Sequence, residues 1–302
     1  MPAPAISDYA RGFLVTALGV LIISPDALLI RLIGADEWTI LFWRGMGFFT
    51  VQAAIVTARY GRGTLEALGR TGLTGLGIAL MMGMSNSLFV ISISNTAVAN
   101  TLIIIASAPL VAALLGRVFL KERLKPRTLA AGLVAFGCVG VTVLGGVGSG
   151  GWIGDLAAVV LMVEMAIFLT VLRRTRGTDM LPALACGGIV TCLVGLAGSS
   201  VLVPAPADWP WIALLSLVVS PVSFVFISIG PRYLPAPEVS LLMLLETVLG
   251  PLWVWLVLTE KPADAALAAG AAMVATLVVH AWLGHKEELA RRGAPAPART
   301  AP

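Results

Sequence analysis

The chain has 302 residues, of which 58% are hydrophobic and only 12% are charged, and its mean hydropathy is +0.96. A soluble domain typically carries about 25% charged residues, so this sequence has too few charges to cover a water-facing surface. The net charge of +4 comes from Lys and Arg in short segments between apolar runs, which is not the pattern of a nucleic-acid-binding surface. We therefore expect a membrane protein that lies in a lipid bilayer and binds no nucleic acid.

Ten apolar runs follow one another along the chain. A helix needs roughly 20 mostly apolar residues to cross ~30 Å of hydrocarbon. Short separators rich in Gly, Pro, Ser and Asn divide the runs, as expected of turns. The pattern predicts an all-α membrane protein with ten transmembrane helices. They cover residues 12–33, 38–58, 72–93, 96–120, 128–147, 152–172, 181–203, 210–230, 236–258 and 265–284.

The tail at 285–302 is rich in Ala, Pro and Arg, and we expect it to be disordered and cytoplasmic. The basic residues set the orientation, because cytoplasmic loops collect Lys and Arg. With both termini inside, sixteen of the 20 Lys and Arg residues fall on the cytoplasmic side. Only Arg31 and Lys261 fall outside, while Arg44 and Arg117 lie within spans. We expect a multi-pass protein of the inner (cytoplasmic) membrane with cytoplasmic termini.

The sequence contains an internal repeat. A shift of 138 residues lays the run Leu129–Gly132 onto Leu267–Gly270 and Glu122 onto Glu260. The two halves, 12–147 and 152–284, each hold five spans. Because five is odd, the second half must be inserted upside down relative to the first. Inverted repeats are typical of secondary transporters, although duplication occurs in other membrane proteins too.

The chain resembles the EamA-type drug/metabolite transporter family. The resemblance rests on the two five-span repeats, on Phe42-Trp43-Arg44 early in the second span, and on the run from Asn95 to Ala108-Pro109. It rests also on the acidic residue that closes the fourth and ninth spans. The family's Leu-Glu-Pro-like step reads Leu245-Glu246-Thr247 here, with Pro251 one turn later. The resemblance implies two inverted EamA-like repeats and a metabolite or drug carrier, often an exporter or exchanger.

Four ionisable residues within spans are candidates for binding or coupling, because such residues are costly in hydrocarbon. Asp26 and Arg44 lie at a similar depth, near ~10 Å below the outer surface at ~1.5 Å rise per residue. They form either a structural ion pair or a site for a charged solute, with Arg44 offering a planar fork to a carboxylate. Glu164 and Glu246 lie near the middle of their spans. Each either makes structural hydrogen bonds or binds a proton or an amine.

Uncharged polar residues form a second group of candidates. Asn86 in the third span and Ser220 beside Pro221 in the eighth either line a polar cavity or join helices by hydrogen bonds. The same alternatives hold for Ser85, Ser87, Asn100, Ser107 and Ser223. Asp155 lies in a first helical turn, where an acidic residue suits the helix dipole, and we expect it to be structural.

These features predict a secondary transporter of an amino-acid-like or other polar metabolite, with protons as a possible coupling ion. A carrier of a planar neutral metabolite, such as a nucleobase or flavin, is an alternative in which Trp43, Phe89 and Phe168 would stack on the ligand. A non-transporting membrane partner is a further alternative. We expect no enzyme activity, metal or cofactor, because both histidines lie at the edge of the last run and no cluster has metal-ligand spacing.

Overall fold

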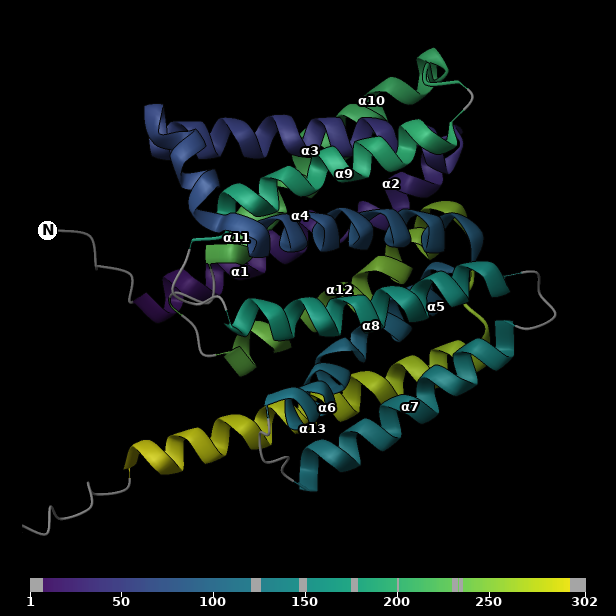
Figure 1. Ribbon diagram of the computed structural model, residues 1–302. Helices are drawn as coiled ribbons and strands as arrows, with labels where there is room; N and C mark the ends of the chain where they lie inside the picture. The colour runs from purple at the N-terminus through teal and green to yellow at the C-terminus, as the bar shows by residue number, and fades with distance from the viewer. Residues whose placement is uncertain are drawn as a thin grey trace, which may run out of the picture.

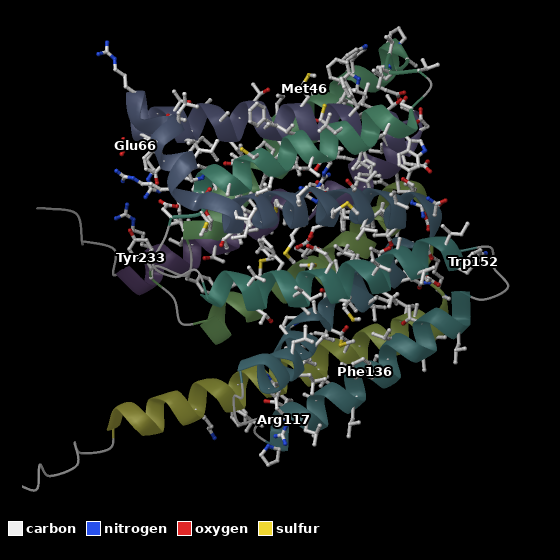
Figure 2. The ribbon with its side chains drawn as sticks, in the orientation of Figure 1. Met46, Glu66, Arg117, Phe136, Trp152 and Tyr233 are labelled. Atoms are coloured by element: carbon white, nitrogen blue, oxygen red, sulfur yellow. The ribbon has the colours of Figure 1, made fainter. Side chains whose placement is uncertain are left out.

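The computed structural model describes residues 8–120, 126–146, 151–174, 179–199, 201–229, 233 and 236–293. Within these ranges every regular element is a helix. Five stretches are long and apolar enough to cross a membrane, judged by length and composition: Arg11–Leu32, Glu37–Asn95, Val98–Leu115, Leu181–Gly198 and Pro206–Ile229. Large apolar side chains are exposed on different sides of the bundle, such as Met46 and Phe136 (Figure 2). These are the features of a membrane-embedded protein.

The helices fall in all ten expected intervals. In the first half they are α1 (Asp8–Ile23), α2 (Asp26–Leu32), α3 (Glu37–Tyr60), η1 (Gly61–Gly63), α4 (Thr64–Asn95), α5 (Val98–Ala106), α6 (Ala108–Leu120) and α7 (Pro126–Gly146). In the second half they are α8 (Trp152–Arg174), α9 (Leu181–Gly198), η2 (Pro206–Asp208), α10 (Trp209–Ala213), the π-helical η3 (Leu214–Val219), α11 (Ser220–Ile229), α12 (Ala236–Leu258) and α13 (Asp264–Gly293).

The helices form an elongated bundle in which most axes run roughly alongside one another (Figure 1). Helix α3 packs against α9, α4 packs against α8 and α9, and α7 packs against α13. The start of α1 and the end of α13 lie at the same end of the bundle (Figure 1). Two large apolar clusters are buried. One gathers side chains of α2, α3, α5 and η3, and the other joins α5 and α6 to α7, α8 and α13.

Several helices are interrupted, and the sequence gives a reason for each interruption. The first is at Pro25 between α1 and α2, because proline has no N–H to donate to the helical ladder. In α4 the chain leaves helical geometry at Gly72, whose φ of 57° is a conformation that glycine adopts readily. The π-helical segment η3 ends at Val219, two residues before Pro221, and its widened turn accommodates the hydrogen bond that proline cannot donate.

Two helix ends differ from the expectation. Helix α13 continues to Gly293, beyond residue 285, where we expected disorder to begin. Residues 286–292 are Lys, Glu, Leu, Ala and Arg, all good helix formers. Residues 294–302 lie outside the described residues.

The seventh interval also ends early, because α9 stops at Gly198 rather than near residue 203. Residues 201–205 are not helical. The carbonyl oxygens of this stretch accept side-chain hydrogen bonds from α3 instead. The Thr39 hydroxyl donates to the Val201 oxygen at 2.7 Å, and the Trp43 indole donates to the Leu202 oxygen at 2.8 Å.

Candidate functional site

A buried ion pair joins α2 to α3. The break at Pro25 places Asp26 in the first turn of α2, and its side chain is 2% exposed. Arg44 Nη1 donates to both carboxylate oxygens of Asp26, at 2.9 and 3.0 Å. The Arg44 side chain is 6% exposed. The two residues that the sequence placed at a common depth are therefore in direct contact.

Ser220 brings a third element to this pair. Its hydroxyl donates to Asp26 Oδ1 at 3.0 Å. Ser220 follows η3, and Pro221 lies directly after it. The Asp26 carboxylate thus connects α2, α3 and the start of α11. The helical hydrogen bonds are interrupted just before α2 and at the start of α11, so the site lies beside two helix breaks.

Glu246 approaches the pair from α12. It lies within electrostatic range of both Asp26 and Arg44. Its side chain is partly exposed, and among the described residues its carboxyl group accepts no hydrogen bond. Two turns later on the same helix, Trp253 Nε1 donates to Ser24 Oγ at 2.9 Å and holds α12 beside the break between α1 and α2.

The site holds one cationic and two acidic side chains. Arg44 is neutralised by Asp26, its Nε atom is buried without a partner, and the Phe89 ring lies 5.8 Å from the guanidinium carbon. A second carboxylate in such a place is favoured when it gains a positive partner, because the neighbouring Asp26 carboxylate repels it. Glu246 is therefore the group of this site that is suited to receive a proton or an ammonium group.

Glu164 and Asn86 are not joined to this ion pair by any described contact. Ser85 on α4 donates a hydrogen bond to Glu164 on α8, while Glu164 Oε1 is buried without a partner. The Asn86 amide donates to the Met82 oxygen of its own helix at 3.2 Å. Glu164 thus belongs to the interface of α4 and α8, and the described hydrogen bond of Asn86 stays within α4. The structure thus brings together Asp26, Arg44, Ser220 and Glu246.

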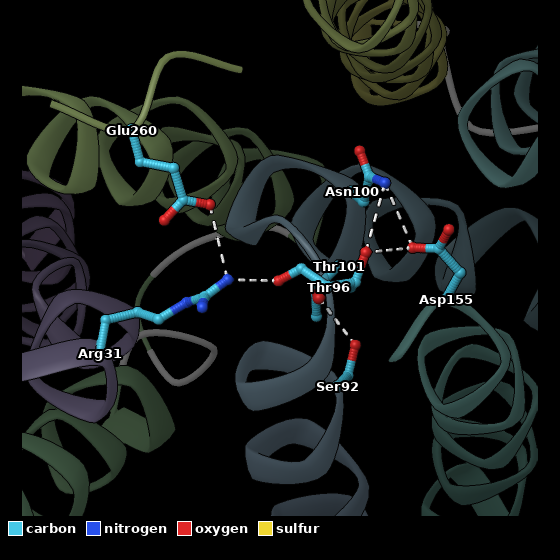
Figure 3. A network of polar contacts seen from close by, with 7 residues as sticks. All are labelled: Arg31, Ser92, Thr96, Asn100, Thr101, Asp155 and Glu260. Carbon is cyan, nitrogen blue, oxygen red and sulfur yellow. Dashed lines mark hydrogen bonds and ion pairs between the residues drawn. The ribbon is translucent and has the colours of Figure 1, made fainter. Parts of the chain in front are cut away.

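Sequence reasoning missed a polar network at the end of the bundle where α8 begins (Figure 3). Asp155, which we expected only to suit the dipole of α8, is fully buried. Its Oδ1 accepts from the Thr96 hydroxyl at 2.7 Å and from the Asn100 amide at 3.2 Å. Arg31 donates to the Thr96 backbone oxygen at 2.6 Å and lies 3.5 Å from Glu260. The one signal for this network in the sequence was the polar run that begins at Asn95.

The comparisons with known proteins give the fold alone. No family model matches the sequence, and no curated protein matches it. A solved structure described only as "Crystal structure of protein" is similar, with a TM-score of 0.59 and 22% sequence identity. The match covers 92% of this chain and 99% of the other. Nearly the whole chain therefore adopts a fold that has been observed before.

Proposed function

We propose that this chain is a secondary transporter of a small polar metabolite in the inner membrane and that it works by alternating access. It crosses the bilayer ten times, with both termini in the cytoplasm. Helix in all ten expected intervals supports this number. The start of α1 and the end of α13 lie at the same end of the bundle, which agrees with an even number of crossings (Figure 1).

The proposal includes two inverted repeats, and the helix positions support them. Helices α5 and α12 begin at Val98 and Ala236, and α7 and α13 begin at Pro126 and Asp264. Both pairs of starts are separated by the 138 residues of the sequence repeat. Members of matched pairs also pack together, namely α3 with α9, α5 with α12, and α7 with α13. Such pairing favours a pseudo-twofold relation between the halves.

The family that fits this organisation is the EamA-type drug/metabolite transporters. Two of the residues that carry the resemblance, Arg44 and Glu246, lie close together in the structure. Arg44 is in the buried ion pair, and Glu246 approaches that pair on a continuous α12 that contains Pro251. Proline at this position leaves the carbonyl of Thr247 without its helical partner, which softens the helix next to Glu246. These places support membership as part of the proposal.

The observation that carries the function is the ion pair with Glu246 beside it, at a break between helices. A carboxyl group without hydrogen bonds inside a membrane protein is costly unless it has a partner that comes and goes. An ammonium group or a proton is such a partner. Arg44, with its unpartnered Nε, offers the opposite charge. Both signs of charge in one place favour an amino-acid-like solute, with protons as the coupling ion.

The planar-metabolite alternative receives no support from the positions of the aromatic side chains. Phe89 faces Arg44, Trp43 stacks edge-to-face on Trp209, and Phe168 packs against the separate cluster of Ile78, Met180 and Ala183. Trp43 and Phe89 border the same apolar cluster, but each has another partner, and no described ring contact joins the three side chains into one stacking site. We therefore keep the polar metabolite as the proposed substrate class.

The proposal is tested by comparing metabolites in the medium of cells that express the wild type or Glu246→Gln at equal membrane levels. Glu66→Gln is the matched control, because Glu66 is an exposed residue paired with Arg70 at the surface. We expect the wild type and the control to change the external level of one chemical class, and Glu246→Gln to lose that change. Equal fluxes for all three proteins at every pH would remove Glu246 from the mechanism.

A further inference from the structure

A polar cavity lies away from the ion-pair site. It has a volume of about 470 Å³ and is lined by residues of α2, the turn between α4 and α5, the end of α7 and the starts of α8 and α13. Asp26, Arg44 and Glu246 are not among its lining residues. By the positive-inside orientation, this cavity is at the outer end of the bundle. Its size is that of a small-molecule site.

Arg31 supplies the positive charge of this cavity. Among the described lining residues it is the one cation, and none of them is acidic. Arg31 uses a single nitrogen, Nη2, for both of its contacts, while its Nε is buried without a partner. Its contact with Glu260 is long at 3.5 Å, and the two side chains are 26% and 37% exposed. Arg31 Nη1 makes no contact with the described residues, so the end of the guanidinium can still donate to a carboxylate in the cavity.

Asn100 supplies an acceptor in the same cavity. The residue is 9% exposed, and its amide nitrogen contacts Asp155 Oδ1 at 3.2 Å and Thr96 Oγ1 at 3.4 Å. An ionised carboxylate only accepts hydrogen bonds, so Asp155 fixes the amide with its NH₂ group toward α8. The carbonyl oxygen of Asn100 then points the other way, as Figure 3 shows, and has no partner among the described residues.

We propose that this cavity is a second binding site, in which a small zwitterionic solute is held before it reaches the ion-pair site. Arg31 binds the carboxylate of the solute, and the carbonyl oxygen of Asn100 accepts a hydrogen bond from its ammonium group. The solute carboxylate replaces Glu260 as the partner of Arg31. This inference takes its solute class from the proposed function, but its site shares no residue with the ion-pair site.

The test is calorimetric binding to the purified protein in lipid nanodiscs. The probes are the twenty protein amino acids, added one at a time. Each amino acid that binds is compared with two analogues, the amine that lacks its carboxyl group and the acid that lacks its amino group. Arg31→Gln is expected to weaken binding by about tenfold or more, because it removes a charge-assisted hydrogen bond. Arg31→Lys keeps the charge without the fork and is expected to weaken binding less.

Glu260→Gln tests the same site because it is expected to increase the affinity for amino acids. Removing the competing carboxylate from Arg31 is expected to tighten amino-acid binding several-fold, and a misfolded variant cannot produce that result. Glu246→Gln, in the other site, is expected to weaken or remove the binding event of the ion-pair site and to leave the event that depends on Arg31 unchanged.

Two results would overturn the inference. One is binding that is lost in Glu246→Gln and unaltered in both Arg31→Gln and Glu260→Gln, which would leave a single site and preserve the proposed function. The other is the absence of binding by all twenty amino acids to the wild type. The proposed function would then be decided separately, by the metabolite comparison.

Discussion

At the scale of single residues, the central feature is an ion pair almost completely removed from solvent. Two charges taken out of water lose their hydration, and their attraction offsets that loss only when the geometry is good. Asp26 accepts from both Arg44 and Ser220, so most of its hydrogen-bonding capacity is used. Arg44 gains the face of Phe89 as well. The pair is thus a structural joint between α2, α3 and α11, and under the proposed function it is also where a charged solute exchanges partners.

We expect Asp26→Asn to destabilise the protein by about 3–5 kcal/mol, because it leaves Arg44 as a buried and uncompensated charge. The double variant with Arg44→Gln is expected to recover much of this loss. The measurement is chemical unfolding in detergent, followed by tryptophan fluorescence. The control is Glu66→Gln, whose exposed pair with Arg70 is worth about 0.3–0.5 kcal/mol. Additive losses in the double variant would show that the two charges do not depend on each other.

The sequence predicted some of these residues better than others, and the reason is geometric. Counting residues from a span end gives depth, and a common depth correctly paired Asp26 with Arg44. Depth says nothing about which helices are neighbours or which face each turns toward the other. For this reason the sequence could not tell that Glu164 and Asn86, which were also candidates, lie apart from the ion pair: Glu164 contacts Ser85 across α4 and α8, and Asn86 contacts Met82 of its own helix. The role of Asp155 was missed for the same reason.

At the scale of elements, the closest contact is between α3 and α9. A Cβ added to Gly45 would lie 2.6 Å from the Gly188 oxygen and closer still to the Cys192 backbone nitrogen, and a Cβ on Gly188 would lie 2.7 Å from the Gly45 oxygen. Glycines on both sides therefore let the two backbones meet, which is the usual way for membrane helices to pack closely. The sequence contains 32 glycines, and only the fold shows that these particular ones face each other.

We expect Gly45→Ala to destabilise the protein by about 1–3 kcal/mol, because the added methyl group meets backbone atoms that cannot rotate away. Gly137→Ala on α7 is the matched control. A Cβ there has open space, so the change is expected to be neutral or to stabilise the helix by about 0.5–1 kcal/mol. Thermal unfolding of the two variants beside the wild type measures both. Equal effects of the two substitutions would mean that α3 and α9 do not approach each other closely.

The interruptions of the helices were only partly predictable. Pro25 signals its break directly, since proline removes a backbone donor. The turn between α4 and α5 occurs at residues 96–97, two residues after the shortest predicted separator at 94–95. The π-helical η3 was not foreseen, because the residues before Pro221 are ordinary apolar residues that fit any helix type. Local patterns therefore locate helices well and their internal irregularities less well.

At the scale of the whole molecule, the proposed topology fixes which end of the bundle faces the cytoplasm. We expect Leu65→Cys, exposed before the kink in α4, to react with a membrane-impermeant thiol reagent only after the cells are opened. Ala207→Cys and Lys261→Cys are expected to react in intact cells. The background for these tests replaces Cys138, Cys186 and Cys192, none of which forms a disulfide. Labelling of Ala207→Cys and Lys261→Cys from opposite sides would contradict the proposed topology.

The measurement that tests the central claim most directly is the accessibility of Ser220→Cys from each side of the membrane. Ser220 contacts Asp26 inside the proposed site, and its position is buried. Alternating access predicts slow but complete reaction with an impermeant thiol reagent added outside, and also with the same reagent added inside. Ala207→Cys and Leu65→Cys calibrate the two sides. Reaction of Ser220→Cys from one side only, or from neither while both controls react, would contradict the account.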